Sequence, residues 1–128
     1  MIFLDSSVVL AQLLMESRRP PLGLWQERLA SSRLLQYEVW NRIRAYAHRP
    51  SHEGEVRSTL ARVYLIEMSE EVLARALQPF PVAVRTLDAL HLSTALSLTA
   101  GGETVELASY DNRLIAAAHA LGVPLAAL

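Results

Sequence analysis

Four acidic residues, Asp5, Glu38, Asp88 and Asp111, could together perform metal-dependent hydrolysis. Each lies where a predicted strand ends or a predicted helix begins. In an open α/β sheet, ligands bind beyond the carboxyl ends of the strands, so these side chains are expected to converge. Converging carboxylates repel one another unless a cation lies among them or some are protonated. The pattern therefore predicts an oxygen-ligand site for Mg²⁺ or Mn²⁺, and metal-assisted cleavage of a phosphodiester.

Each acid also has a purely structural interpretation. Asp5 and Asp111 would cap the helices that follow them, and Asp88 would be an ordinary acid in a first helical turn. Glu38 would pair with Arg42 one turn later. Asp88 is the least ordinary of the four, because its apolar neighbours make a lone ionised carboxylate costly. Considered together, the four acids favour one metal site over four unrelated structural roles.

His91 follows Asp88 by one turn on the same helix face, and it could serve as a metal ligand or a general base. A site for a hard cation does not call for imidazole. We therefore expect His91 to pack in the core or to form hydrogen bonds.

The composition excludes several classes of protein. The chain has 128 residues, no cysteine and a formal net charge of −1, and its basic residues are all arginine. The absence of cysteine excludes a disulfide framework and a thiolate zinc site. The absence of lysine excludes a P-loop and a receiver domain. Arg42, Arg44 and Arg49 form a basic helix edge, which is either a solvated face or a surface that follows phosphates.

The length favours a single domain, residues 1–128. No segment combines a basic start with a long apolar run, so no signal peptide is predicted. The apolar stretches are too short to span a membrane. We expect a soluble, cytoplasmic protein.

Strands and helices alternate along the chain. We predict strands at 2–4, 33–36, 64–67, 104–108 and 123–126, a turn at 31–32, and helices at 6–15, 22–30, 37–48, 53–62, 69–78, 86–99 and 111–121. This alternation predicts an α/β fold in which helices cover both faces of a mostly parallel sheet of four to five strands.

Four segments carry a resemblance to a known family. These are Ile2–Ser7, Glu38 within its helix, Arg85–Ala95, and Leu107–Leu114 with the closing Leu121–Val123. In this arrangement the chain resembles a PIN-domain ribonuclease, and within that group the toxin of a VapBC toxin–antitoxin pair. The match spans nearly the whole chain, and Arg85–Ala95 is its most specific part.

The resemblance implies a three-layer α/β/α PIN-like fold and a Mg²⁺- or Mn²⁺-dependent endoribonuclease. We expect Asp5, Glu38, Asp88 and Asp111 to be catalytic, with Asp5, Asp88 and Asp111 as the metal ligands. Asp5 and Asp88 would bind the metal directly or through water, and Glu38 and Asp111 would complete the shell or hold a second ion. Ser7 and Ser109 are expected to orient carboxylates or water. It also implies a homodimer, inhibition by a small antitoxin, and an RNA substrate such as a transfer RNA or a ribosomal loop.

Two alternatives remain at this point. A catalytically inactive PIN-fold interaction module would keep the acidic pocket as a vestige and use apolar surface to bind a protein partner. A phosphatase of the haloacid dehalogenase type would need an aspartate two residues after Asp5, where this chain has Ser7. The phosphatase is therefore much the weaker alternative.

Overall fold

The computed structural model describes residues 1–46 and 50–128. Its centre is a four-stranded sheet in the order β3-β2-β1-β4, and every neighbouring pair of strands is parallel. The strands are β1 (Ile2–Leu4), β2 (Leu29–Ser32), β3 (Val63–Ile66) and β4 (Glu106–Ala108). The predicted α/β class and parallel sheet are therefore confirmed.

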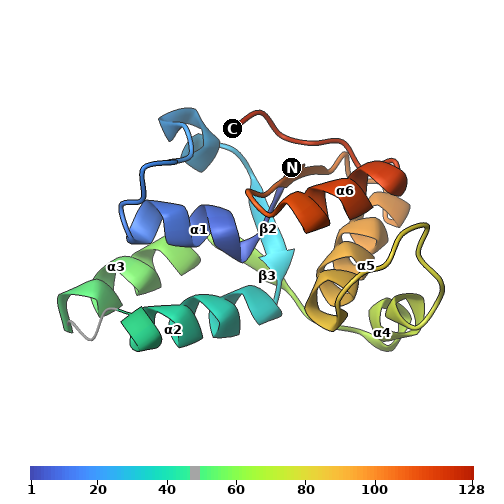
Figure 1. The fold of residues 1–128 in the computed structure, drawn as a ribbon, viewed down its shortest axis with the longest axis horizontal. Coiled ribbons are helices and arrows are strands. Elements are labelled where there is room, and N and C mark those ends of the chain that lie inside the picture. Colours follow the sequence, from blue (N-terminus) through green and yellow to red (C-terminus); the bar gives the residue numbers. More distant parts are fainter. Residues whose placement is uncertain (47–49) are drawn as a thin grey trace.

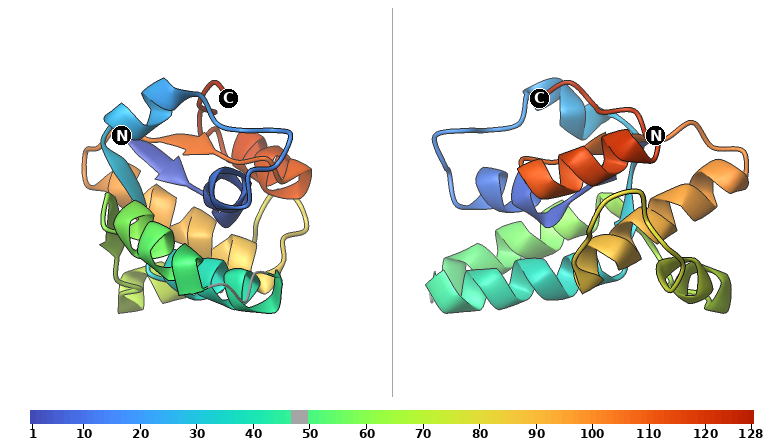
Figure 2. Two further views of the ribbon diagram at one scale, coloured as in Figure 1. Left: turned by 90° about the vertical axis from the view of Figure 1, so that its left-hand side faces the viewer. Right: turned by 45° about the vertical axis from the view of Figure 1, so that its right-hand side comes forward.

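Within the described residues, six α-helices and one 3₁₀ helix surround the sheet. They are α1 (Ser6–Leu13), η1 (Leu22–Gln26, the 3₁₀ helix), α2 (Leu34–Tyr46), α3 (Pro50–Leu60), α4 (Glu70–Ala76), α5 (Thr86–Ala100) and α6 (Asn112–Ala120). α1, α2 and α3 lie on one side of the sheet, and α5 and α6 lie on the other (Figures 1 and 2). None of the helices in the described ranges has the length and apolar character needed to cross a membrane.

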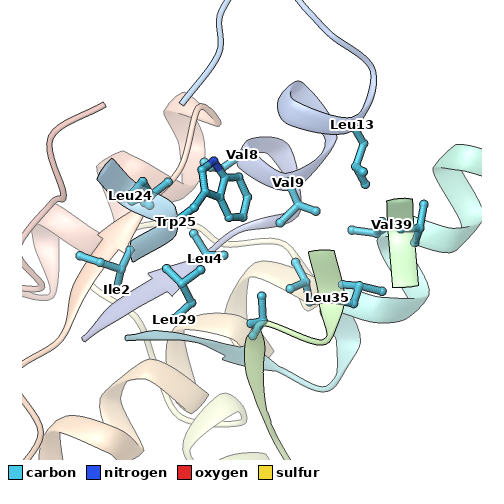
Figure 3. Packing of buried hydrophobic residues seen from close by; sticks show 14 of the residues in the cluster. Ile2, Leu4, Val8, Val9, Leu13, Leu24, Trp25, Leu29, Leu35 and Val39 are labelled. Carbon is cyan, nitrogen blue, oxygen red and sulfur yellow. The ribbon is translucent and has the colours of Figure 1, made fainter. Parts of the chain in front are cut away.

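Alternate residues of β1 point into two separate hydrophobic cores, as the two-residue period of a strand requires. Ile2 and Leu4 pack with Val8 and Leu35 beneath α1 and α2 (Figure 3). Phe3 packs on the other face with residues of α5 and α6. Both faces of the sheet are therefore covered, and the four strands are fixed between two helical layers.

The strand order contains a switch point between β1 and β4. From β1 the chain proceeds through β2 to β3 on one side, and β4 then pairs with β1 from the other side. Leu4 and Ala108, the last residues of β1 and β4, are partners in the register. Asp5 and Ser109 therefore leave the sheet next to each other, at the place where open α/β sheets bind ligands.

The structure corrects three predictions between residues 22 and 36. The predicted helix 22–30 is the short η1 followed by the start of β2, the predicted turn 31–32 is the end of β2, and the predicted strand 33–36 belongs mostly to α2. Ser31 and Ser32 are fully buried in a central strand. Their hydroxyls have partners there, since Ser31 donates to the Leu4 carbonyl at 2.7 Å and Ser32 Oγ lies 2.8 Å from His91 Nδ1. Two serines in sequence indicate a turn, and only distant partners make them suitable for a sheet centre.

The predicted strand at 123–126 is reduced to a single parallel bridge between Leu107 and Leu125. Pro124 has no backbone N–H to donate, which limits pairing at this edge. The helix predicted at 37–48 begins earlier, at Leu34, and its predicted end at 47–48 lies outside the described residues. The remaining predicted elements agree with the structure to within a few residues.

Candidate active site

The structure brings all four predicted acids to one pocket of about 800 Å³. Asp5 follows β1, Glu38 projects from α2, Asp88 lies in the first turn of α5, and Asp111 is the N-cap of α6. Four segments far apart in sequence therefore supply one carboxylate each to the carboxyl edge of the sheet. The structural interpretation of Asp5 and Asp111 also holds, because both cap their helices while lining the pocket.

Asp5 is buried and firmly held. Its Oδ2 atom accepts hydrogen bonds from Ser7 N at 3.2 Å, Ser7 Oγ at 2.5 Å and Ser109 Oγ at 3.0 Å. The two hydroxyls in turn accept from the backbone N–H groups of Tyr110 (2.9 Å) and Asp111 (3.0 Å). This network joins the segment after β1 to the segment after β4, so Ser7 and Ser109 position Asp5.

Glu38 is held through its two oxygens by different partners. Ser6 Oγ donates to Oε2 at 3.2 Å, and Oε1 contacts His91 Nε2. His91 is itself buried, and Ser32 Oγ faces its other ring nitrogen. Burial alone would lower the pKa of His91, but the hydrogen bond and the charge of Glu38 outweigh it, so the pKa is raised above its usual value. His91 is therefore a hydrogen-bonding histidine, as expected, and it orients Glu38.

Asp88 and Asp111 share a single cation, the guanidinium of Arg85. Arg85 Nε lies 3.4 Å from Asp88 Oδ2, and Arg85 Nη2 lies 3.1 Å from Asp111 Oδ2. Burial raises the pKa of Asp88, Arg85 opposes this shift, and the charges of Asp111 and Asp5 add to it. The three aspartates are thus close enough to influence one another electrostatically.

The donor set suits a hard divalent cation, because it consists of carboxylate oxygens next to hydroxyl groups. Asp5 Oδ1 accepts no hydrogen bond from any residue in the described part of the chain, so its lone pairs are available. The space between Asp88 and Asp111 already holds a positive group, the Arg85 guanidinium. Within residues 1–46 and 50–128, no three acidic or imidazole side chains stand together in ligating positions. A cation would therefore need a rearrangement of side chains, above all of Arg85.

Several residues of the site were not predicted for their own chemistry. No role of its own is predicted for Arg85 from the sequence beyond the Arg85–Ala95 segment. Its position three residues before Asp88 nevertheless favours an ion pair between the two side chains on one helix. No local pattern in the sequence indicates that Ser6 contacts Glu38 or that Ser32 contacts His91. The alternative pairing of Glu38 with Arg42 is not observed, since the Arg42 guanidinium lies 4.8 Å from the centre of the Tyr46 ring. Arg49, which belongs to the predicted basic helix edge, lies outside the described residues.

Comparisons with known proteins agree with this architecture. The PIN domain family model matches residues 2–121. Ribonuclease VapC35 of Mycobacterium tuberculosis is 32% identical over 132 residues, covering 99% of this chain and 96% of that protein. Ribonuclease VapC46 of the same species is 32% identical over 129 residues, covering 98% and 96%.

A solved structure shares the fold. The toxin-antitoxin complex from Klebsiella pneumoniae contains a chain that matches with a TM-score of 0.69 and 21% identity, covering 91% of each chain. The family match over residues 2–121, the α/β/α architecture and the 32% identity to VapC ribonucleases agree with one another. The chain belongs to the PIN-domain family, and within it to the VapC group.

Proposed function

We propose that this protein is a Mg²⁺- or Mn²⁺-dependent endoribonuclease, the toxin component of a type II toxin–antitoxin system, that hydrolyses RNA phosphodiester bonds. The observation that carries the proposal is the convergence of Asp5, Glu38, Asp88 and Asp111 on one pocket at the switch point of the sheet. Relatives that are 32% identical over nearly the whole chain are named ribonucleases, which supports the same activity here.

In this proposal Asp5, Asp88 and Asp111 hold the cation. Asp5 offers Oδ1 in a fixed direction, because three donors hold Oδ2. When bound, a divalent cation activates water as a nucleophile and offsets charge on phosphoryl oxygens. Glu38 would orient the attacking water by hydrogen bonding, since His91 and Ser6 fix its carboxylate. Ser7 and Ser109 act by positioning Asp5.

Arginines at the pocket support an RNA substrate. Arg18 and Arg42 line it together with the acids. The Arg18 guanidinium lies 5.2 Å from the centre of the Tyr110 ring, and Arg18 is exposed to solvent. Guanidinium groups pair well with phosphate oxygens. A chain with a net charge of −1 thus presents positive groups beside its acidic centre. A structured RNA such as a transfer RNA or a ribosomal loop is the proposed target class.

The proposal extends to a homodimer and to inhibition by a small antitoxin in the cytoplasm. Exposed apolar side chains on α4 and the segment that follows it support a partner surface, namely Leu73, Leu77 and Val82. Leu77 is 88% exposed, and it lies one helical turn after Leu73 on α4. Light scattering of the purified protein tests the dimer, and co-purification with the product of the adjacent reading frame tests the antitoxin.

The decisive experiment measures RNA cleavage by the purified protein with Mg²⁺ or Mn²⁺, with and without EDTA. The Asp88→Asn variant, purified in parallel, reports any contaminating ribonuclease. We expect cleavage that needs the cation, stops with EDTA and is lost in the variant. Equal cleavage by wild type and variant, or cleavage that EDTA leaves unchanged, would refute the assignment.

One observation favours the second candidate, a catalytically inactive PIN-fold interaction module. Arg85 already forms an ion pair with Asp88 and with Asp111, and His91 contacts Glu38, so these acids have partners without a metal. The same assay separates the two functions. A well-folded protein that binds its antitoxin but cleaves no RNA under any cation would establish the inactive module.

A further inference from the structure

The strongest unexplained feature of the pocket is the position of Arg85. This residue is the N-cap of α5, yet its side chain makes no capping hydrogen bond. The guanidinium instead reaches across to two carboxylates from different elements, Asp88 on its own helix and Asp111 at the start of α6. Arg85 is thereby the only link between these two acids that the described contacts contain.

The contacts made by Arg85 coincide with those that a metal ion would need. Its nitrogens bind the Oδ2 atoms of Asp88 and Asp111, which are two of the three carboxylates proposed to hold the cation. A carboxylate oxygen that pairs with a guanidinium offers less electron density and less space to a second cation. Two positive groups within one small pocket also repel each other. Arg85 and a divalent ion therefore compete for the same two carboxylates.

The two ion pairs are weak enough to be exchanged. The Arg85 side chain is 59% exposed, while those of Asp88 and Asp111 are 13% and 32% exposed. Water screens such pairs, and exposed ion pairs contribute little to stability. The exposed guanidinium can turn toward solvent, whereas Asp5 has less freedom because it is buried and three donors hold its Oδ2 atom.

We propose that Arg85 is an internal cation of the metal site: it holds Asp88 and Asp111 together in the metal-free protein, and a divalent ion must displace it to bind. Arg85 is thus a positioning residue that sets the affinity of the site for a divalent cation. This inference rests on the proposed function, since it assumes that these aspartates are metal ligands.

The test measures Mn²⁺ binding directly, by isothermal titration calorimetry and by the electron paramagnetic resonance signal of free Mn²⁺, without RNA. The variants are Arg85→Gln, which removes the charge, and Arg85→Lys, which keeps the charge but loses the planar fork. Arg18→Gln is the matched control, because Arg18 lines the same pocket but lies over the Tyr110 ring. All proteins are compared at the same pH, about 8, which is well above the ordinary pKa of a carboxyl group.

We expect Arg85→Gln to bind Mn²⁺ about two- to tenfold more tightly than wild type, which corresponds to the loss of two screened ion pairs. Arg85→Lys should lie between the two proteins, and Arg18→Gln should change the affinity less than Arg85→Gln. A second measurement uses thermal unfolding. Arg85→Gln should be less stable than wild type without metal, because Asp88 and Asp111 then repel, and Mn²⁺ should raise its Tm by more.

The outcomes separate this inference from the proposed function. If wild type binds Mn²⁺ and Arg85→Gln binds it equally or more weakly, the inference is wrong while the nuclease proposal stands. A similar gain in Arg18→Gln would also overturn it, because general charge would then explain the effect. If neither wild type nor Arg85→Gln binds Mn²⁺, both the inference and the metal-dependent function fail.

Discussion

The two halves of the pocket hold their carboxylates in different ways. The anchored half consists of Asp5 and Glu38, whose oxygens are fixed by Ser7, Ser109, Ser6 and His91. The adjustable half consists of Asp88 and Asp111, which share the half-exposed guanidinium of Arg85. Hydrogen bonds from hydroxyl, backbone and imidazole groups hold one position, whereas screened ion pairs permit several. The pocket therefore joins a rigid reference point to acids that can adapt to a cation.

The comparison predicts that substitutions in the two halves change the free energy of unfolding by different amounts. Asp5→Ala should abolish cleavage and also lower the free energy of unfolding by about 2 kcal/mol, because a helix cap and buried hydrogen bonds are lost together. Urea denaturation followed by circular dichroism measures the stability, and the RNA cleavage assay measures the activity. If Asp5→Ala keeps its full stability, the first half is not anchored in the way the contacts indicate.

Asp88→Asn should separate activity from stability. We expect cleavage to fall on the order of 10³-fold or more. The free energy of unfolding should change by less than about 0.5 kcal/mol, because the lost pair with Arg85 is screened by solvent. The same two assays apply. A loss of stability as large as that of Asp5→Ala would remove the distinction between the halves.

Ser109→Ala tests the link between the halves, since Ser109 Oγ donates to Asp5 and accepts from the N–H of Asp111. We expect about a tenfold loss of cleavage, because supporting hydrogen bonds orient metal ligands. The expected loss of stability is about 1 kcal/mol. Ser97→Ala is the control: Ser97 Oγ donates to the Thr94 carbonyl at 2.7 Å, away from the pocket, so its loss should spare activity. Equal activities in the two variants would contradict a positioning role for Ser109.

The smallest expected effect concerns pH. The folded-state pKa of His91 is raised, so the pairing with Glu38 stabilises the fold fully below the ordinary histidine pKa and loses this contribution as pH rises through the raised value. The stability difference between wild type and Glu38→Gln should therefore be larger at about pH 6 than at about pH 9. Urea denaturation across this range measures it. Ser6→Ala, which removes the other hydrogen bond to Glu38, should show a difference that does not vary with pH. A Glu38→Gln difference that grows with pH would show that the pair is not ionic.

Much of the fold could be predicted from local patterns. The apolar run Ile2–Leu4 ending at Asp5 predicts a strand that delivers an acid to the sheet edge, and the structure has both. The long apolar helix stopped by Gly101 is present as α5, with Gly101 as its C-cap. Such features depend on residues a few positions apart, so they are visible in the sequence.

The segment 29–32 shows why other parts could not be predicted. Leu29, Ala30 and two serines carry no clear period, and the serines indicate a turn. β2 is stable because both of its neighbours supply parallel partners and because Leu4 and His91 satisfy the buried hydroxyls. These partners lie 27 and 59 residues away, so no local pattern reports them.

The candidate site divides in the same way. The kinds of acid and their places after strands or at helix starts follow from short stretches of sequence, because caps and strand ends are local features. The hydrogen-bond partner of each carboxylate oxygen does not follow from short stretches of sequence. Ser109 reaches Asp5 across 104 residues and Arg85 reaches Asp111 across 26, and both contacts require the pairing of β1 with β4 and the packing of α5 against α6. Hydrogen bonds act only over about 3 Å and in narrow directions, so it is the packing that makes one acid rigid and leaves another free to exchange its cation.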